Sequence, residues 1–363
     1  MKNRRKNWLI AGVAAAALLE FVIIVALLLP ANREPAVTAA PPAAEPAQLE
    51  QRLSAGASRN TAAQPEKTEK AKEESPAAEA DAPEETASGA ASAAEPPEVQ
   101  EKEKPEGEQS ATEILANARI VAHGMGAIGG LETPNCLEAF QAQYEAGVRV
   151  FEADLRLTRD GRVVLRHDWW PDAWQEGIDW ARIPTLEKFK AEKILGEYTP
   201  LSFQDLLLLM EQYPDICVIT DTKFVDSDVF FIQFDSMLAD AHELGLTYLF
   251  DRMFIQVYSG NMRTAVNNIY PFPHYIYTLY QDEEPFKGTT ADFRKKAAYS
   301  QERGIEGITM SSYWWKPEYA AIAEEYGLKL YVHTVNKAET AQKMLDAGVA
   351  AIYSDSLTPG DLS

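Results

Sequence analysis

From Ala111 to the C-terminus, apolar runs typical of strands alternate with helical patterns almost without a break. Strand-like runs such as "VRVFEADLRLT" and "DICVITDTK" are separated by patterns such as "NCLEAFQAQYEAG", for which Asn135 is the expected cap. This alternation predicts parallel β/α architecture. Eight strand-like runs can be counted, and a length of about 250 residues is typical of one (β/α)8 barrel. The sequence therefore favours an α/β fold, a closed TIM barrel over residues 111–363.

Two segments of different composition precede the barrel. Residues 1–30 contain an apolar run from Trp8 to Leu29 behind four basic residues, which predicts a transmembrane anchor with the rest of the chain outside the cytoplasm. Glu20 within the run counts against this prediction, and cleavage would release the protein. Residues 31–110, rich in Ala, Pro and Glu, are predicted to be a disordered linker. We expect a single-pass protein of the cell membrane with an extracytoplasmic catalytic domain, or a secreted protein if the anchor is removed.

Charge and cysteine content narrow the classes of partner. The chain has a formal net charge of −21, most of it on the predicted barrel. Such an acidic surface argues against nucleic acid as a partner and suits divalent cations. Cys136 and Cys217 are interpreted as buried free thiols, although a disulfide stays open. The oligomeric state is not indicated.

The run "FEADLRLTRDGRVVLRHDWW", residues 151–170, carries the strongest chemical signal. Glu152 and Asp154 are two positions apart and so share one face of a strand. Asp160-Gly161 predicts a two-residue hairpin turn, which would place His167 opposite Asp154 with Cβ atoms about 5 Å apart. Two carboxylates on one face repel each other unless a cation or a proton lies between them.

Other strand ends carry similar residues. His123 ends the first strand, and Asp221 and Lys223 end the strand in "CVITDTK". Catalytic residues of barrels come from the C-terminal ends of several strands. Three carboxylates for Ca²⁺ or Mg²⁺, two histidines for proton transfer and a lysine for an anion fit phosphodiester cleavage.

The domain from Ile120 onward resembles the glycerophosphodiester phosphodiesterase family, within the phosphatidylinositol-phospholipase-C-like barrel superfamily. The resemblance rests on "VAHGMG", on E-x-D followed by T-x-D-G and H-D, on "ITDTK", on "YVHTVN" and on "DAGVAAIYSD". It implies that Glu152, Asp154 and Asp221 bind a metal, that His123 and His167 are the acid–base pair, and that Lys223 contacts phosphate. The implied substrate is a glycerophosphodiester, either a lipid headgroup or a glycerol-phosphate polymer.

Three departures from the family pattern indicate a divergent branch. Gly124 stands where the family usually has arginine, and Thr133-Pro134-Asn135-Cys136 replaces Pro-Glu-Asn-Thr, so a glutamate is absent while Asn135 is kept. Asp221 is shorter than the usual glutamate. A phospholipase C- or D-like enzyme acting on phospholipids or lysophospholipids therefore stays open, as does a barrel that binds without turnover.

Further residues are candidates for contact with the substrate. Residues 169–199 are predicted to be a Trp-rich insertion over the barrel mouth, beginning at Trp169, and Trp314 follows a later strand. His333 in "YVHTVN" stands where the family often has an aromatic residue. Asp168 is expected either to orient His167 or to bond to the backbone at the start of the loop.

Overall fold

The computed structural model describes residues 99–169, 183–223, 227–279 and 285–363. The predicted anchor at 1–30, most of the predicted linker and three tryptophans of the insertion lie outside these residues. Within the described ranges, no helix is long and apolar enough to cross a membrane.

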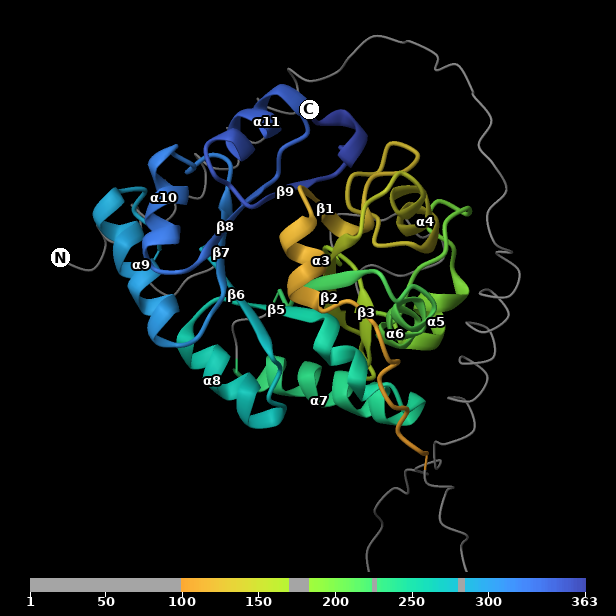
Figure 1. Ribbon diagram of the computed structural model, residues 1–363. Coiled ribbons are helices and arrows are strands. Elements are labelled where there is room, and N and C mark those ends of the chain that lie inside the picture. The colour runs from red at the N-terminus through yellow and green to blue at the C-terminus, as the bar shows by residue number, and fades with distance from the viewer. Residues whose placement is uncertain (1–98, 170–182, 224–226, 280–284) are drawn as a thin grey trace, which may run out of the picture. The chain divides into compact units, whose positions relative to one another are not determined.

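Eight parallel strands close into a barrel, as the sequence predicted (Figure 1). Each strand pairs with the next one in the ring, and the last pairs with the first. The strands are β1 (Ile120–Ala122), β2 (Val150–Leu157), β4 (Cys217–Asp221), β5 (Met253–Val257), β6 (His274–Thr278), β7 (Gly307–Ser311), β8 (Lys329–His333) and β9 (Ala351–Ser354).

Helices surround this ring in Figure 1 and follow the strands in the chain. They are α4 (Leu137–Glu145), α6 (Phe203–Gln212), α7 (Ser227–Leu244), α8 (Gly260–Ile269), α9 (Thr290–Glu302), α10 (Glu318–Glu325) and α11 (Ala338–Asp346). A shorter helix, α5 (Leu186–Ala191), lies in the predicted insertion, and three 3₁₀ turns are η1 (His123–Met125), η2 (Thr247–Arg252) and η3 (Pro359–Asp361). The prediction that Asn135 caps α4 is wrong, because Cys136 occupies that position without a side-chain bond.

The hairpin after β2 differs by one residue from the predicted register. The antiparallel strand β3 (Val163–Leu165) pairs Leu157 with Val163, and the amide of Thr158 donates to the carbonyl of Arg162. The connecting loop therefore has three central residues instead of two, with Gly161 at φ +74° as the left-handed residue that such a loop requires. Arg166, not His167, bonds to the backbone of Asp154.

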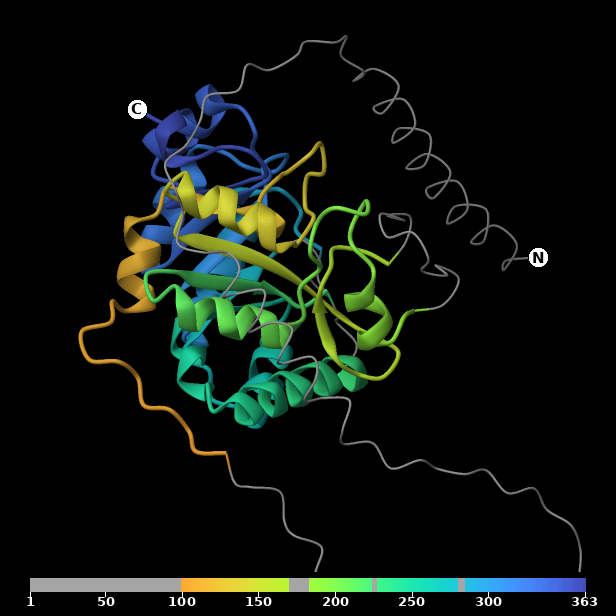
Figure 2. The same cartoon turned by 90° about the vertical axis from the view of Figure 1, so that its right-hand side faces the viewer.

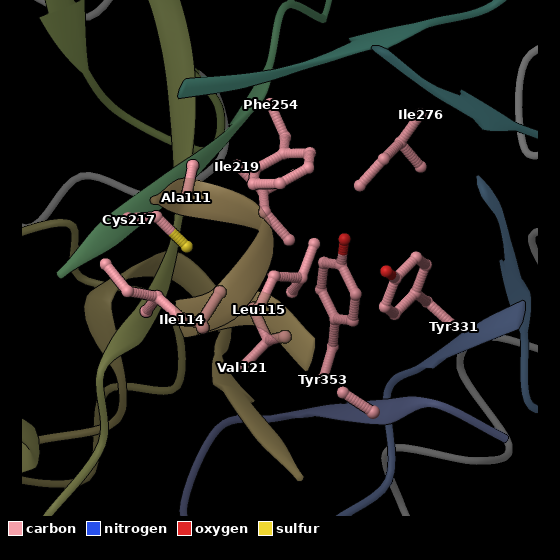
Figure 3. Packing of buried hydrophobic residues seen from close by; sticks show 12 residues of the cluster. Ala111, Ile114, Leu115, Val121, Cys217, Ile219, Phe254, Ile276, Tyr331 and Tyr353 are labelled. Carbon is pink, nitrogen blue, oxygen red and sulfur yellow. The ribbon is translucent and has the colours of Figure 1, made fainter. Parts of the chain in front are cut away.

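Helix α3 (Ala111–Asn117) closes the barrel at the N-terminal ends of the strands (Figure 2). Its apolar side chains pack with Val150, Cys217 and Ala351, which begin or nearly begin three strands. Figure 3 shows Ala111, Ile114 and Leu115 beside this layer. Both cysteines are buried free thiols, and burial raises the pKa of Cys136 to about 12. This end of the barrel is packed with apolar side chains, which leaves the opposite end for polar chemistry.

Residues 99–110 belong to the predicted linker, yet they contact the barrel. Glu108 forms an ion pair with Arg252 at 3.0 Å, and both side chains are almost fully buried. Glu101 pairs with His242, and the amide of Lys102 donates to the carbonyl of Gly245. The packed part of the chain thus begins before Ala111.

Candidate active site

A cavity of about 260 Å³ lies at the C-terminal ends of the strands. Its described lining is almost wholly polar: His123, Glu152, Arg156, His167, Asp168, Asp221, Lys223, Gln256, Tyr258, Thr278, His333, Thr334 and Tyr353. The strand ends of the parallel ring bring together residues that are far apart in the sequence, as the barrel topology requires.

Three carboxylates meet beside this cavity, on β2 and β4. One oxygen each of Glu152, Asp154 and Asp221 lies within 4.8 Å of the others. The pairing of β2 with β4 sets this geometry, because Asp154 stands directly beside Asp221 in the register. The two acids on one strand face and the third on the neighbouring strand thus form the cluster that their spacing predicted.

Each carboxylate is held by a specific donor. The backbone amide of Gly124 donates to Glu152 at 2.7 Å. The side-chain amide of Asn135 donates to Asp154 at 2.8 Å, while its oxygen accepts from the Asp154 amide. The hydroxyl of Tyr258 donates to Asp221. These bonds orient the oxygens before any ligand arrives.

Lys223 lies among the same carboxylates. Its Nζ is 2.6 Å from both Asp154 and Asp221. Burial works to raise the pKa of Asp154, yet the Lys223 charge and the two histidines lower it. Burial and the Asp154 charge raise the pKa of Glu152 to about 8. One lysine is therefore too little positive charge for three clustered acids, two of which are buried.

This donor set fits a hard divalent cation. Carboxylate oxygens are the ligands that Ca²⁺ and Mg²⁺ prefer. A cation bound by Glu152, Asp154 and Asp221 would supply the charge that Lys223 alone does not. The identity of the cation is left to experiment.

His123, the first residue of η1, has a buried aspartate as its partner. Its Nδ1 is 2.7 Å from Asp355, which lies just after β9 and is 5% exposed. The amide of Asn336 donates to the second oxygen of Asp355. Burial of the imidazole works to lower its pKa, but the Asp355 hydrogen bond and the charges of Glu152 and Asp154 raise it to about 9.

His167 also has an aspartate as its partner, but this aspartate is its neighbour in the sequence. Its Nδ1 is 2.8 Å from the carboxylate of Asp168, the next residue. Arg156 donates to the carbonyl of His167 at 2.9 Å and pairs with Asp168. Asp168 thus contacts the imidazole, one of the two arrangements expected from the sequence. In both histidines Nδ1 is engaged, which leaves Nε2 as the nitrogen available to a substrate.

The structure brings most of the predicted site residues to the cavity. His123, His167, Glu152, Asp221, Lys223 and His333 line it, and Asp154 lies directly beneath. Asn135 does not line it, because it is fully buried behind Asp154. The rings of Trp169 and Trp314 pack on Phe189 and Phe286 instead, and neither is among the described lining residues.

The replacement of the family arginine by Gly124 has a steric reason. Gly124 adopts φ +54°, and a Cβ at this position would lie 2.5 Å from the Cβ of Thr133. The space beside Gly124 is therefore filled by Thr133, one of the three residues that differ from the family's Pro-Glu-Asn-Thr.

Sequence reasoning missed several cavity residues. Asp355 directly follows the strand-like run "AIYS", so its place after the last strand was a usable signal. Tyr258, Gln256 and Thr278 lie on or just past β5 and β6, strands whose ends carry no acid or histidine to draw attention. Arg156 continues the Glu152–Asp154 face by two positions, and that spacing was also readable.

Comparison with known proteins agrees with this geometry. The model of the glycerophosphoryl diester phosphodiesterase family matches residues 127–358. The glycerophosphodiester phosphodiesterase of Caldanaerobacter subterraneus subsp. tengcongensis is 23% identical over 233 residues, 61% of this chain and 88% of that protein. The Bacillus subtilis enzyme of the same name is 20% identical over 273 residues, 67% of this chain and 85% of that protein.

Solved structures share the fold. An Oleispira antarctica phosphodiesterase in complex with the product sn-glycerol-3-phosphate has a TM-score of 0.54 at 17% identity, covering 68% of this chain and 96% of that one. A glycerophosphodiester phosphodiesterase from Parabacteroides distasonis has a TM-score of 0.52 at 17% identity, covering 66% and 93%. The chain belongs to the glycerophosphoryl diester phosphodiesterase family and is a phosphoric diester hydrolase.

Proposed function

We propose that this chain hydrolyses glycerophosphodiesters in a reaction that requires a divalent cation, with His123 and His167 as the acid–base pair. The observation that carries the proposal is their arrangement. Both histidines line one cavity beside the three-carboxylate cluster, and each has Nδ1 on an aspartate. Nε2 of one can take a proton while Nε2 of the other gives one.

The proposed reaction divides the work among residues of the chain. Glu152, Asp154 and Asp221 would hold the cation, which would supply positive charge to the phosphoryl oxygens. One histidine removes a proton from the attacking water, the new P–O bond forms, and the bond to the alcohol breaks. The other histidine gives its proton to the departing alcohol oxygen. Lys223 lines the cavity and would stabilise negative charge on the phosphoryl group.

The substrate class follows from the family and from the lining. The related Oleispira antarctica phosphodiesterase is in complex with the product sn-glycerol-3-phosphate. A polar cavity of about 260 Å³ suits a small diester better than two acyl chains. We therefore place lipid headgroup diesters or glycerol-phosphate polymers before intact phospholipids.

The test is turnover by the full-length chain. Glycerophosphocholine, glycerophosphoglycerol and a lysophospholipid would each be assayed with Ca²⁺, with Mg²⁺ and with chelator. We expect cation-dependent release of an alcohol from the glycerophosphodiesters, and loss of that release in His167→Ala. Full activity in chelator would contradict the proposal.

Product analysis distinguishes the proposed hydrolysis from a phospholipase C-like reaction. A phospholipase C-like reaction that uses the substrate's own hydroxyl would release a cyclic phosphate, whereas hydrolysis in H₂¹⁸O places one labelled oxygen in the phosphate product. The carboxylate cluster favours hydrolysis, since a cyclising reaction without metal has no need of three acids. A cyclic product that accumulates would replace the proposed mechanism.

We also propose that the catalytic domain lies outside the cytoplasm, tethered by residues 1–30. The apolar run and its basic flank support this location. The test is protease accessibility of the domain in intact cells, together with its recovery in membranes after a high-salt wash. Recovery in the cytosolic fraction would overturn the proposal.

A further inference from the structure

We propose that Gln256 and Thr278 form a subsite that binds the hydroxyl groups of the substrate's glycerol moiety. This inference rests on the proposed function and adds residues that select the alcohol. Both side chains line the cavity, and they are only 5% and 4% exposed. They lie on the adjacent strands β5 and β6, at the C-terminal ends that face the catalytic chemistry.

Among the described residues, the oxygen of the Gln256 side-chain amide has a hydrogen-bond partner and its nitrogen has none. The hydroxyl of Tyr353 donates to its oxygen at 3.4 Å inside the barrel. Its nitrogen has no hydrogen-bond partner among the residues that the structure describes. The two N–H groups of Gln256 can therefore donate to a ligand in the cavity.

Thr278 supplies the complementary group. Among the described residues, its hydroxyl also has no partner, and it can either donate or accept. A substrate hydroxyl needs both a donor and an acceptor as partners, since it accepts through its oxygen and donates through its hydrogen. Gln256 as donor and Thr278 as acceptor would satisfy one such group, or two neighbouring ones.

Ring order places this subsite across the barrel from β1 and beside β4. Counted around the barrel, β6 lies opposite β1, the strand that leads into His123. A phosphoryl group bound at the carboxylates would thus extend one substituent toward β5 and β6. The other charged cavity residues pair with one another, as Lys223 does with Asp154 and Asp221, whereas this wall is neutral. Neutral donors and acceptors suit a polyol.

The experiment compares two substrates that differ only in the hydroxyls. Glycerophosphocholine and propyl phosphocholine would be assayed with the full-length wild type, Gln256→Leu and Thr278→Val. We expect wild type to favour glycerophosphocholine in kcat/KM. Each variant should lose roughly fivefold on glycerophosphocholine, since one net hydrogen bond is worth about 1 kcal/mol, and little on the propyl ester.

Thr309→Val is the matched control. Thr309 pairs with Thr278 in the β6–β7 register and is buried, but it does not line the cavity. We expect this variant to keep the wild-type preference between the two substrates. Equal losses on both substrates in Gln256→Leu and Thr278→Val would overturn the subsite and indicate a merely structural role.

A binding measurement keeps the subsite separate from the reaction. Calorimetric affinities for sn-glycerol 3-phosphate and propyl phosphate do not depend on turnover. Tighter binding of the glycerol phosphate, lost in Gln256→Leu and Thr278→Val, would support the subsite even if no diester were hydrolysed. Equal binding of both ligands by wild type would overturn it, whereas hydrolysis without hydroxyl preference would leave the proposed function standing.

Discussion

His123 and His167 differ in what surrounds their aspartates, and this difference predicts their roles. Burial works to lower the pKa of His123, but the hydrogen bond to Asp355 and the charges of Glu152 and Asp154 raise it to about 9, so we expect His123 to carry the proton and act as the acid. A general acid is needed for a poor leaving group such as choline alkoxide and is dispensable for p-nitrophenolate. His123→Ala should therefore lose at least about 100-fold on glycerophosphocholine but far less on a p-nitrophenyl diester.

His167→Ala is the control for this assignment. If His167 is the base, its loss should reduce kcat about equally on both substrates, because water must be activated in each case. Asp355→Asn removes a carboxylate that raises the pKa of His123. The fall in activity at high pH should therefore begin at a lower pH in this variant than in wild type. The reverse pattern, with His167→Ala rescued by the better leaving group, would exchange the two roles.

His333 is a histidine of the cavity that should not exchange protons during turnover. Burial, with the charge of His123, lowers its pKa to about 4. The unfolded chain takes up this proton near pH 6.5, so the folded state loses up to about 3 kcal/mol of stability as pH falls from 6.5 to 4. A cation bound nearby would lower the pKa of His333 further. The shift of this pKa therefore has the same direction with and without the metal.

An NMR titration of the imidazole resonances checks the state of His333. Its ring should stay neutral at pH 5. In His333→Gln the free energy of unfolding should fall less steeply below pH 6.5 than in wild type. A midpoint for His333 near 6.5, the ordinary value for histidine, would contradict the prediction.

At the scale of single residues, the charged side chains of the cavity could be predicted from the sequence and the neutral ones could not. Acids and histidines at strand ends stand out because burial without a partner is costly. Gln256 and Thr278 gave no such signal. For Trp314 the sequence left two roles open, since an aromatic residue near a barrel mouth can contact a substrate or pack on a neighbour, as Trp314 does on Phe286.

At the scale of elements, the order of strands and helices was predictable and the hairpin register was not. The Asp160-Gly161 pair is compatible with loops of two or three residues, and only the contacts of Thr158 and Asp160 select between them. The Thr158 hydroxyl donates to Asp160, which also accepts from the amide of Leu186. That last contact comes from within the insertion at 169–199, so the sequence of the hairpin alone did not contain it.

The segment before α3 is an element whose contribution to stability can be measured. Glu108 and Arg252 form a buried ion pair, and removing one partner of such a pair costs about 3 kcal/mol or more. We expect Glu108→Ala to lower Tm by roughly 6–12 °C, at about 2–4 °C per kcal/mol for a domain of this size. Differential scanning calorimetry measures this shift.

Glu106→Ala is the matched control on the same segment. Glu106 is exposed, and its loss should change Tm by less than about 2 °C. A Tm for Glu108→Ala equal to that of Glu106→Ala would mean that residues 99–110 do not dock on the barrel in solution. A chain truncated to begin at Ala111 should show the same loss as Glu108→Ala or a larger one.

At the scale of the whole molecule, binding of the cation should be coupled to folding. The three carboxylates come from β2 and β4, which meet only in the closed barrel, so the unfolded chain has no comparable site. A ligand that binds only the folded state stabilises it by about 2.7 kcal/mol at 100 times its Kd. We therefore expect Tm to rise with the concentration of the preferred cation, which identifies Ca²⁺ or Mg²⁺ without any substrate.

Asp154→Asn supplies the internal comparison for this titration. It removes one ligand charge at a buried position, and its single amide oxygen can accept from Asn135 or from Lys223 but not from both. The variant should lose most of the cation-dependent rise in Tm, and it should lose activity in proportion. If wild type shows no shift with either cation while remaining active in chelator, Lys223 alone neutralises the cluster, and the chemistry is carried by the two histidines without a metal.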